Sequence, residues 1–388
     1  MMQDAFEYGT VVTDALFIGR DEQIQELMWN INSGQNCVVY GDRRVGKSSL
    51  IHESIKLYKS KNKKEKFFCL YLDLSTCTRS KDFIELISRT LDQELRKITP
   101  LKKKFSDLGN FIKSIRPTSK INNFTGELEH SIDFIGSTEE VQNSLVEVIG
   151  LIESISTEYK ILLVLDEFHI VSYWDDSDQI QWQIRSRLQL QKNISYIFSG
   201  SSRKLITKLF AESSSALYRS GPLIYVDNKI DFLIFANWIK SRFKLAQIKI
   251  NGEPSKVLLD FTRAHPYYTQ KLCYFLWMTQ SQSKNHEIAV SDIWNAIQRI
   301  INNENHVFRE RLEMLSFNQQ NVLRAIAITV TSLEKQSLSN LEAHSRISKT
   351  SIQSAIKQLE AQRDQIIIKI DNTFRLEDPF FEFWLGAN

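Results

Sequence analysis

The chain has 388 residues, of which 42% are hydrophobic and 24% are charged, with a formal net charge of +3. That net charge is too small to indicate a nucleic-acid or membrane partner by itself, and no apolar run approaches the ~20 residues that a membrane-spanning helix needs. The length exceeds what one hydrophobic core usually supports, so we expect two or three domains and no membrane span.

The four cysteines lie far apart in the sequence and lack the spacing of a zinc site or a disulfide framework: Cys37, Cys69, Cys77 and Cys273. The first twenty residues carry acids early and have no long apolar stretch, so they do not read as a secretory signal. We therefore expect a reducing, cytoplasmic setting.

Short apolar runs alternate with helical patterns up to about residue 226. The runs are residues 36–41, 67–75, 161–167, 195–202 and 223–227. Alternation of this kind is typical of a parallel sheet covered by helices on both faces. The pattern predicts an α/β domain.

The first of these runs leads directly into a glycine-framed basic loop. Residues 41–48 fit the pattern G-x-x-x-x-G-K-[ST], between a predicted strand and a predicted helix. Glycines let the backbone wrap a phosphate, and its N–H groups together with the helix N-terminus supply a positive site. We expect Lys47 to reach the β and γ phosphates of a nucleotide and Ser48 to ligate Mg²⁺. The predicted nucleotide contacts are Gly41, Asp42, Arg43, Arg44, Val45, Gly46, Lys47, Ser48 and Ser49.

A phosphate loop predicts a carboxylate at the end of a neighbouring strand, and the run "ILLVLDEFHI" at residues 161–170 supplies it. We expect Asp166 to hold Mg²⁺ directly or through water, and Glu167 to polarise an attacking water. The adjacent glutamate favours hydrolysis over passive nucleotide binding. We interpret His169 as a packing residue beside Phe168 rather than as a ligand.

Residues 100–137 form a segment that is long for a connection within a compact domain, so we expect it to have structure of its own. Its "GELEHSIDFIG" stretch alternates in the manner of an extra strand or hairpin.

Beyond residue 229 the pattern becomes helical, and no convincing strand interrupts it before about residue 305. The last eighty residues carry three helical patterns, at 316–330, 337–345 and 348–363, followed by two extended runs around Asp371-Asn372. We therefore expect three domains: an α/β core at 1–228, a helical lid at 229–305 and a winged-helix domain at 306–388.

The third helical pattern of the C-terminal domain has two faces. Its apolar stripe is Ile352, Ala355, Ile356 and Leu359, with Ser348 or Thr350 as the helix cap. The opposite face predicts a DNA-recognition surface formed by Lys349, Thr350, Gln353 and Lys357. From Glu310 onward, however, nine basic residues face ten acidic ones, fewer positive charges than a dedicated DNA-binding domain commonly has. A protein-contacting or regulatory winged helix therefore has equal standing with one that binds double-stranded DNA.

Several motifs, taken in order, resemble the archaeal-type ATPases, P-loop proteins related to AAA+ enzymes and grouped with the STAND signal-transduction ATPases. They are "LFIGRDEQIQEL" (16–27), "YGDRRVGKSSL" (40–50), "LVLDEF" (163–168), "YIFSGSS" (196–202), "SALYRSGPLIYVD" (215–227), "AHPYYTQKLCYFLW" (264–277) and the C-terminal "FRLEDPFFEFWL" (374–385). The resemblance spans nearly the whole chain.

The resemblance implies further site residues. The box Phe17, Ile18, Gly19 and Arg20 is expected near the adenine and the base of the phosphate loop, and Pro266 among the nucleotide-binding residues. A serine after the fourth core strand, Ser201 or else Ser199, is expected to sense the γ-phosphate. An arginine, Arg219 or in reserve Arg203, is expected to touch the nucleotide in cis or from a neighbouring subunit.

Two features depart from the family pattern. Ala264-His265-Pro266 stands where a Gly-x-Pro sequence is usual, and no arginine follows at a clear second-sensor position. We interpret His265 as a structural residue at the start of a helix. Coupling between nucleotide and lid is therefore expected to differ from that of relatives.

Together these patterns predict a switch protein that binds ATP with Mg²⁺ and hydrolyses it. Its winged helix is expected to dock DNA or a protein effector, in a nucleic-acid transaction or in defence or signalling, and homo-oligomers are a further expectation. The alternative is a non-hydrolysing, ATP-binding regulatory scaffold that acts through protein contacts.

Overall fold

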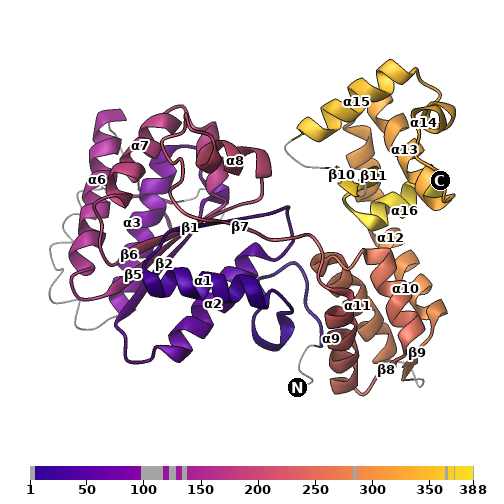
Figure 1. Cartoon of the computed structure of the whole chain (residues 1–388), viewed down its shortest axis with the longest axis horizontal. Helices are drawn as coiled ribbons and strands as arrows, with labels where there is room; N and C mark the ends of the chain where they lie inside the picture. The colour runs from indigo at the N-terminus through magenta and orange to yellow at the C-terminus, as the bar shows by residue number, and fades with distance from the viewer. Residues whose placement is uncertain are drawn as a thin grey trace. The chain divides into compact units, whose positions relative to one another are not determined.

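The computed structural model describes residues 5–97, 117–121, 128–132, 138–282, 286–362, 366–370 and 372–387. The chain divides into two compact units: Arg20–Asp227, and a second unit that combines Met1–Gly19 with Asn228–Asn388 (Figure 1). Both ends of the chain therefore belong to the same unit.

The unit Arg20–Asp227 is built on a five-stranded sheet whose neighbours all pair in parallel. Its strands are β1 (Cys37–Tyr40), β2 (Phe67–Asp73), β5 (Lys160–Asp166), β6 (Ile194–Gly200) and β7 (Leu223–Tyr225). They correspond to the five predicted runs and lie in the order β2-β5-β6-β1-β7. The acidic strand β5 is thus not the direct neighbour of β1 that the sequence led us to expect, because β6 lies between them.

Helices cover both faces of this sheet, with α1 and α2 on one side in Figure 1. They are α1 (Asp21–Ser33), α2 (Lys47–Lys61), α3 (Ser80–Lys97), α6 (Thr138–Ile155), α7 (Ser177–Leu188) and α8 (Arg203–Ala211), with 3₁₀ turns η2 (Leu74–Thr76) and η3 (Phe168–Tyr173). Alternate strand residues such as Leu163 and Leu165 join Phe83 and Ile149 of the covering helices in one buried cluster. Burial on both faces explains the nearly continuous apolar strands.

The long segment at residues 100–137 contributes an antiparallel pair, β3 (Pro117–Ile121) and β4 (Leu128–Ile132). The "GELEHSIDFIG" stretch thus contains a strand within a hairpin, as expected. The remaining residues of the segment lie outside the described ranges.

The second unit is mainly helical. Its elements are η1 (Asp14–Leu16), α9 (Phe232–Leu245), β8 (Lys249–Ile250), α10 (Gly252–Thr262), α11 (Pro266–Gln280), β9 (Glu287–Ile288), α12 (Val290–Glu313), α13 (Phe317–Thr331), α14 (Leu338–Ser345), α15 (Lys349–Ala361), β10 (Ile367–Ile370), β11 (Thr373–Leu376) and α16 (Pro379–Ala387). The two-residue strands β8 and β9, which pair in parallel, interrupt the region that the sequence assigned to helices alone. Two residues are too short for an alternating pattern to be visible.

The lid helices and the winged helix share one hydrophobic core. This cluster runs from Phe235 of α9 through Tyr268 of α11 to Phe380 of α16. Helix α12 extends across the boundary expected at residue 305, so it contributes to both parts. The division between lid and winged helix stays a prediction, and in this structure the two parts form one packed body.

Residues near the N-terminus also pack into this second unit, although the sequence assigned them to the α/β core. The Phe6 ring lies 5.6 Å from that of Trp238, and the Arg242 Nε donates to the Ala5 carbonyl at 2.8 Å. The Trp238 indole N–H donates to the Ala15 carbonyl at 3.0 Å. Helix α9 therefore anchors the segment that precedes Gly19.

The C-terminal part has the predicted arrangement of three helices and a hairpin, followed by a helix, α16, that the sequence did not predict. Ser316 and Gln319 form a capping box at the start of α13, and the Ser348 hydroxyl caps α15 by accepting from the Ser351 N–H. The apolar stripe of α15 is buried as predicted. Asn372 turns the hairpin with φ of 65°, while Asp371 lies outside the described residues.

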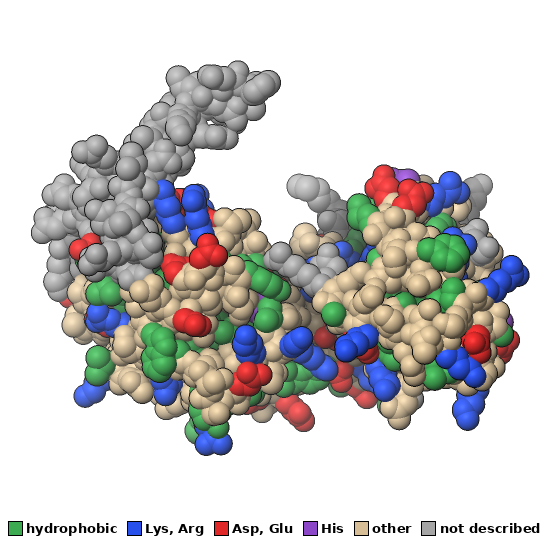
Figure 2. Space-filling view, turned by 90° about the horizontal axis from the view of Figure 1, so that it is seen from above, with side chains coloured by type: hydrophobic (Ala, Val, Ile, Leu, Met, Phe, Trp, Pro, Cys, Tyr) green, Lys and Arg blue, Asp and Glu red, His purple; other side chains and the backbone are tan. Residues whose placement is uncertain are grey.

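No helix in the described part of the chain combines the length and the apolar character needed to cross a membrane. On the face shown in Figure 2, basic and acidic side chains are interspersed over both units. This mixture agrees with the small net charge of the chain.

Candidate functional site

The phosphate loop connects β1 to α2, as predicted. At Gly41 a Cβ atom would lie 2.3 Å from the Val226 carbonyl oxygen, so only glycine fits where the chain passes β7. Gly46 caps α2 in the left-handed region with φ of 90°, where glycine carries no steric penalty. The loop N–H groups and the start of α2 therefore form a positive end that suits a phosphate.

Lys47 lies over this loop and is 5% exposed. Its Nζ donates to the carbonyls of Gly41 at 3.2 Å and Asp42 at 2.7 Å. Burial lowers the pKa of Lys47, while the nearby carboxylates of Glu167, Asp166 and Asp42 oppose that shift. The loop carbonyls thus hold the ammonium group against the loop.

Asp166 and Ser48, the predicted magnesium ligands, are in contact. The Ser48 hydroxyl donates to Asp166 Oδ2 at 2.7 Å, although β6 lies between β5, which ends at Asp166, and β1, which precedes the loop. Asp166 Oδ1 accepts the Glu167 N–H at 3.0 Å, which orients the carboxylate. A serine hydroxyl beside a carboxylate is an oxygen donor set that fits Mg²⁺.

The Tyr71 hydroxyl also donates to Asp166 Oδ2, a contact that the sequence motifs did not reveal. Burial, followed by the charge of Asp166, raises the pKa of Tyr71, so the phenol stays protonated and remains a donor. The only signal available in the sequence was position. Tyr71 stands two residues before Asp73, so these two side chains lie on the same face of β2. Asp73 pairs with Asp166 in the sheet, so the side chains of Tyr71 and Asp166 lie on the same face of the sheet.

Glu167 adopts a left-handed backbone conformation, with φ of 53°, directly after β5. Its Oε2 accepts from the Ser201 N–H at 3.1 Å and from the Ser201 hydroxyl at 2.8 Å, and lies 3.1 Å from His169 Nδ1. Burial alone would raise the pKa of Glu167, but the contacts with His169, Lys47 and Ser201 outweigh it and lower the pKa to about 2. The carboxylate is therefore ionised at neutral pH.

The two serines considered as phosphate sensors differ in exposure. The Ser199 side chain is completely buried, whereas Ser201 is partly exposed and contacts Glu167. This geometry supports Ser201 as the sensor, a role that stays a prediction. His169 is buried, as expected for packing, but it also contacts Glu167, which the sequence interpretation did not anticipate.

The two candidate arginines lie in different surroundings. Arg203 Nε lies 3.8 Å from Asp42 of the phosphate loop, and its guanidinium stacks 4.2 Å from the Tyr225 ring centroid. Arg219 lies over Tyr218, and among the contacts of the described residues none joins it to the phosphate loop. Within this unit the geometry favours the reserve candidate, Arg203, for action in cis.

The remaining predicted nucleotide contacts divide between the two units. Phe17, Ile18 and Gly19 belong to the second unit, as does Pro266, which begins α11 after His265. Arg20 belongs to the α/β unit and donates from its guanidinium to the Asp227 carbonyl. Their roles at the adenine stay predictions.

The predicted recognition face of α15 is presented to solvent. All four of its candidate residues are exposed: Lys349, Thr350, Gln353 and Lys357. Lys349 Nζ lies 3.6 Å from Glu342 of α14, an exposed ion pair that water screens.

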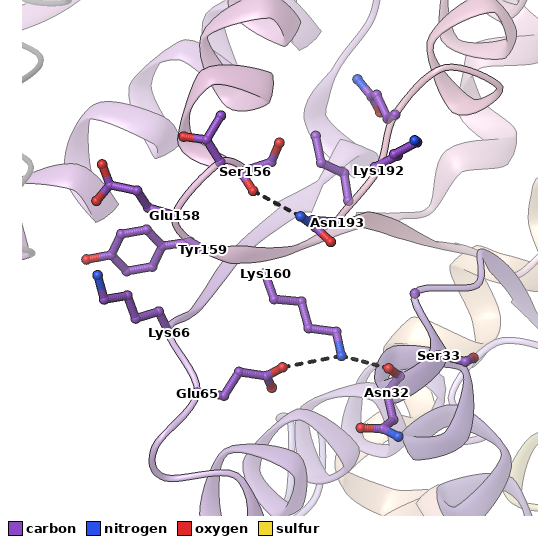
Figure 3. Close-up of a pocket in the computed structure, with 14 residues that line it drawn as sticks. Asn32, Ser33, Glu65, Lys66, Ser156, Glu158, Tyr159, Lys160, Lys192 and Asn193 are labelled. Carbon is purple, nitrogen blue, oxygen red and sulfur yellow. Dashed lines mark hydrogen bonds and ion pairs between the residues drawn. The ribbon is translucent and has the colours of Figure 1, made fainter.

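A separate polar cleft of about 640 Å³ lies at the opposite, amino ends of β2, β5 and β6 (Figure 3). At its floor, Lys160 Nζ donates to the Asn32 carbonyl at 2.8 Å and to the Tyr58 hydroxyl at 2.9 Å, and lies 3.5 Å from Glu65. These contacts occupy the three donors of the ammonium group. We interpret Lys160 as a structural residue whose hydrogen bonds connect β5 to helices α1 and α2.

Family models match two parts of the chain. A model described as an ATPase domain predominantly from Archaea matches residues 17–272, and one described as a probable winged helix domain matches residues 306–387. No protein of curated function matches the sequence.

Solved structures similar to this chain cover nearly its whole length at low identity. The Walker-type ATPase PABY2304 of Pyrococcus abyssi has 15% identity and a TM-score of 0.63, with 98% of this chain and 99% of that one covered. The ORC2 protein of Aeropyrum pernix has 12% identity and a TM-score of 0.57, with 95% and 91% covered. The ORC1 protein of the same organism, solved in complex with DNA, has 12% identity and a TM-score of 0.51, with 97% and 94% covered. At these identities the likeness shows a shared fold.

Proposed function

This chain belongs to the family of ATPase domains found predominantly in Archaea, and from that premise we propose that it binds ATP with Mg²⁺ and hydrolyses the γ-phosphate. The observation that carries the proposal is the convergence of two distant segments. Ser48 of the phosphate loop contacts Asp166, and the next residue, Glu167, is an ionised carboxylate held beside Ser201. The residues proposed to hold the phosphate, to hold the metal and to activate water all lie at the carboxyl ends of the strands.

Binding of the triphosphate follows from the loop. Its N–H groups and the α2 N-terminus would surround the β-phosphate, and Lys47 would exchange the loop carbonyls for phosphate oxygens. That exchange would stabilise the protonated form of Lys47, because negatively charged phosphate oxygens would replace neutral carbonyl oxygens around the buried ammonium group.

A metal would be held by Ser48 and Asp166. Within the described residues no cluster of three or more His, Cys, Asp or Glu side chains is placed to bind a metal ion. Mg²⁺ would therefore complete its octahedral shell with phosphate oxygens and water, as it commonly does. When bound, it supplies neutralisation of the charge that develops on the phosphates.

Hydrolysis is assigned to Glu167. Because Oε2 of Glu167 accepts two hydrogen bonds from Ser201, Oε1 would be the oxygen that accepts a proton from the attacking water. The presence of a glutamate at position 167, directly after Asp166, also argues against the alternative, a non-hydrolysing scaffold. ATP and ADP would then favour different arrangements of the protein, which makes the cycle a switch.

Two variants are compared with the unsubstituted chain. We expect Lys47→Ala to weaken nucleotide binding and abolish phosphate release. We expect Glu167→Gln to bind ATP normally but to release phosphate at least about 100-fold more slowly. Fluorescent-nucleotide titration and a phosphate-release assay measure the two effects separately.

Exposed residues provide matched controls. Lys61→Ala, at the far end of α2, and Glu212→Gln, just beyond α8, should behave like the wild type. Unchanged phosphate release in both Lys47→Ala and Glu167→Gln would refute the ATPase proposal. Normal binding without hydrolysis in the wild type would leave the scaffold alternative.

We further propose that the winged helix docks a partner through α15, with double-stranded DNA as the first candidate. The exposed face of α15 and the fold shared with an ORC1 protein solved in complex with DNA support this proposal. From Arg346 to Arg363 four basic residues face one acidic residue, a local excess that suits phosphates. The second candidate is a protein effector, favoured by the net charge of minus one that the nine basic and ten acidic residues give from Glu310 onward.

A further inference from the structure

Among the described residues, the hydrogen bonds and the ion pair of the Glu167 carboxylate all involve one of its oxygens, Oε2. Oε2 is bonded to the N–H and hydroxyl of Ser201 and lies 3.1 Å from His169 Nδ1. Oε1 accepts no hydrogen bond from the described residues. The two carboxylate oxygens are therefore not equivalent, and the group cannot rotate without losing the Oε2 contacts.

The His169 ring is held where it is by packing. It lies on η3 and is 4% exposed, directly after Phe168, whose ring lies 4.8 Å from that of Phe198 on β6. A Cβ atom at Gly200 would lie 3.2 Å from His169 Nδ1 and 2.6 Å from Ile206 Cδ1. Glycine at position 200 thus leaves room for the ring between η3 and α8.

His169 Nδ1 is also a buried polar atom without a well-aligned hydrogen bond. Glu167 Oε2 is its charged neighbour at 3.1 Å, but the contact does not have the geometry of a hydrogen bond. A buried group left in this condition costs free energy and calls for an explanation. Catalytic hydrogen bonds are often poorly aligned before the substrate binds and tighten in the reacting complex.

We propose that His169 is a positioning residue for hydrolysis: with Ser201 it fixes Oε2 of Glu167, so that Oε1 is aimed at the attacking water. This inference rests on the proposed ATPase activity. The imidazole N–H at Nδ1 would donate to Oε2, and this hydrogen bond would straighten as Glu167 contacts the water. No proton leaves the histidine; the water proton moves to Oε1.

Three substitutions at His169 separate this role from packing. Asn and Leu have the same number of side-chain heavy atoms and branch at the same carbon, but the Asn amide nitrogen replaces Nδ1 while Leu has no donor. Gln keeps an amide but places it near the position of Nε2. We expect His169→Leu and His169→Gln to lower the single-turnover rate of ATP hydrolysis by about 10- to 100-fold, and His169→Asn to stay within about threefold of the wild type.

A purely structural role would give a different pattern. We expect the affinity for a fluorescent ATP analogue and the thermal midpoint to be similar in the Asn and Gln variants, so that a difference in rate between them reflects the position of the donor. Equal rates in Asn and Gln, or a wild-type rate in a folded Leu variant, would overturn the proposal. If the Leu variant fails to fold, the comparison of the Asn and Gln variants still tests whether the position of the donor sets the rate.

A double-mutant test addresses whether His169 acts through Glu167. In a Glu167→Gln background, His169→Leu should change the residual rate by less than about twofold, because residues that act as a unit are not additive. A full further loss in that background would contradict the inference. A wild-type chain that releases no phosphate would instead refute the ATPase proposal and this inference with it.

Discussion

Asp166 Oδ2 is shared by two hydroxyl donors, Ser48 and Tyr71, and this sharing leads to a prediction about magnesium. When Ser48 turns its oxygen to the metal, Tyr71 would remain as the donor that orients Asp166. Partners of this kind typically contribute 10- to 100-fold to metal affinity. We expect Tyr71→Phe to raise the Mg²⁺ concentration for half-maximal binding of a fluorescent nucleotide by about tenfold.

Tyr196→Phe is the matched control for this prediction. Tyr196 is also a strand tyrosine with a hydrogen-bonded hydroxyl, but it donates to Gln191 near the start of β6. Its removal should leave the Mg²⁺ titration unchanged. An unshifted titration in Tyr71→Phe would show that Tyr71 does not support the metal site.

At the residue scale, the sequence predicts those site residues that can be identified from their immediate neighbours in the chain. Ser48 and Glu167 could be found because a glycine-framed loop and a strand end precede them directly. Tyr71 could not be found, because its contact depends on the register of β2 against β5. His169 reaches Glu167 only because the backbone turns left-handed after β5, a conformation that no residue type in the motif specifies.

At the scale of elements, a buried ion cluster joins the lid to the winged helix. Glu382 of α16 pairs with Arg263, which follows α10, at 2.7 Å, and with Arg375 of β11 at 2.6 Å. Arg263 also donates to the Leu376 carbonyl at 2.6 Å. The Glu382 side chain is 5% exposed, so its charge is screened little by water.

We predict that Glu382→Gln destabilises the protein by about 3 kcal/mol, because it leaves two arginines without their counter-charge. Lys249→Ala is the control: its ion pair with Glu287 is exposed and is expected to contribute less than about 1 kcal/mol. Urea unfolding of the full chain measures both changes. Equal, small effects would mean that the ion cluster does not stabilise the joint between lid and winged helix.

Elements with a clear period could be predicted, and elements without one could not. All five strands of the core and the three helices of the winged helix match their sequence patterns. Helix α16 was not predicted, because "PFFEFWLGA" is apolar around most of its surface and shows no helical stripe. Its helical conformation depends on packing against α13 and α12, which the sequence pattern does not show.

At the scale of the whole molecule, the order of the strands could not be read from the sequence. Each run predicts a strand, but a pattern of apolar residues does not say which strands pair. The insertion of β6 between β1 and β5 brings Ser201 to Glu167, so these two side chains meet because of the order of the strands. The assignment of residues 5–19 to the second unit likewise depends on aromatic contacts distant in sequence, such as that of Phe6 with Trp238.

The last prediction concerns what the winged helix docks. If α15 contacts DNA phosphates, replacing both lysines of its exposed face, Lys349→Glu with Lys357→Glu, should weaken duplex binding and reduce the salt dependence of affinity by about two units of slope. Lys240→Glu with Lys244→Glu, on the exposed side of α9, changes the net charge equally and is the control. A salt series with ATP and with ADP measures both effects. Equal losses in the two double variants would mean that overall charge, not α15, attracts DNA. If the wild-type chain did not bind duplex DNA at low salt, the DNA proposal would be wrong and a protein effector would be the remaining candidate.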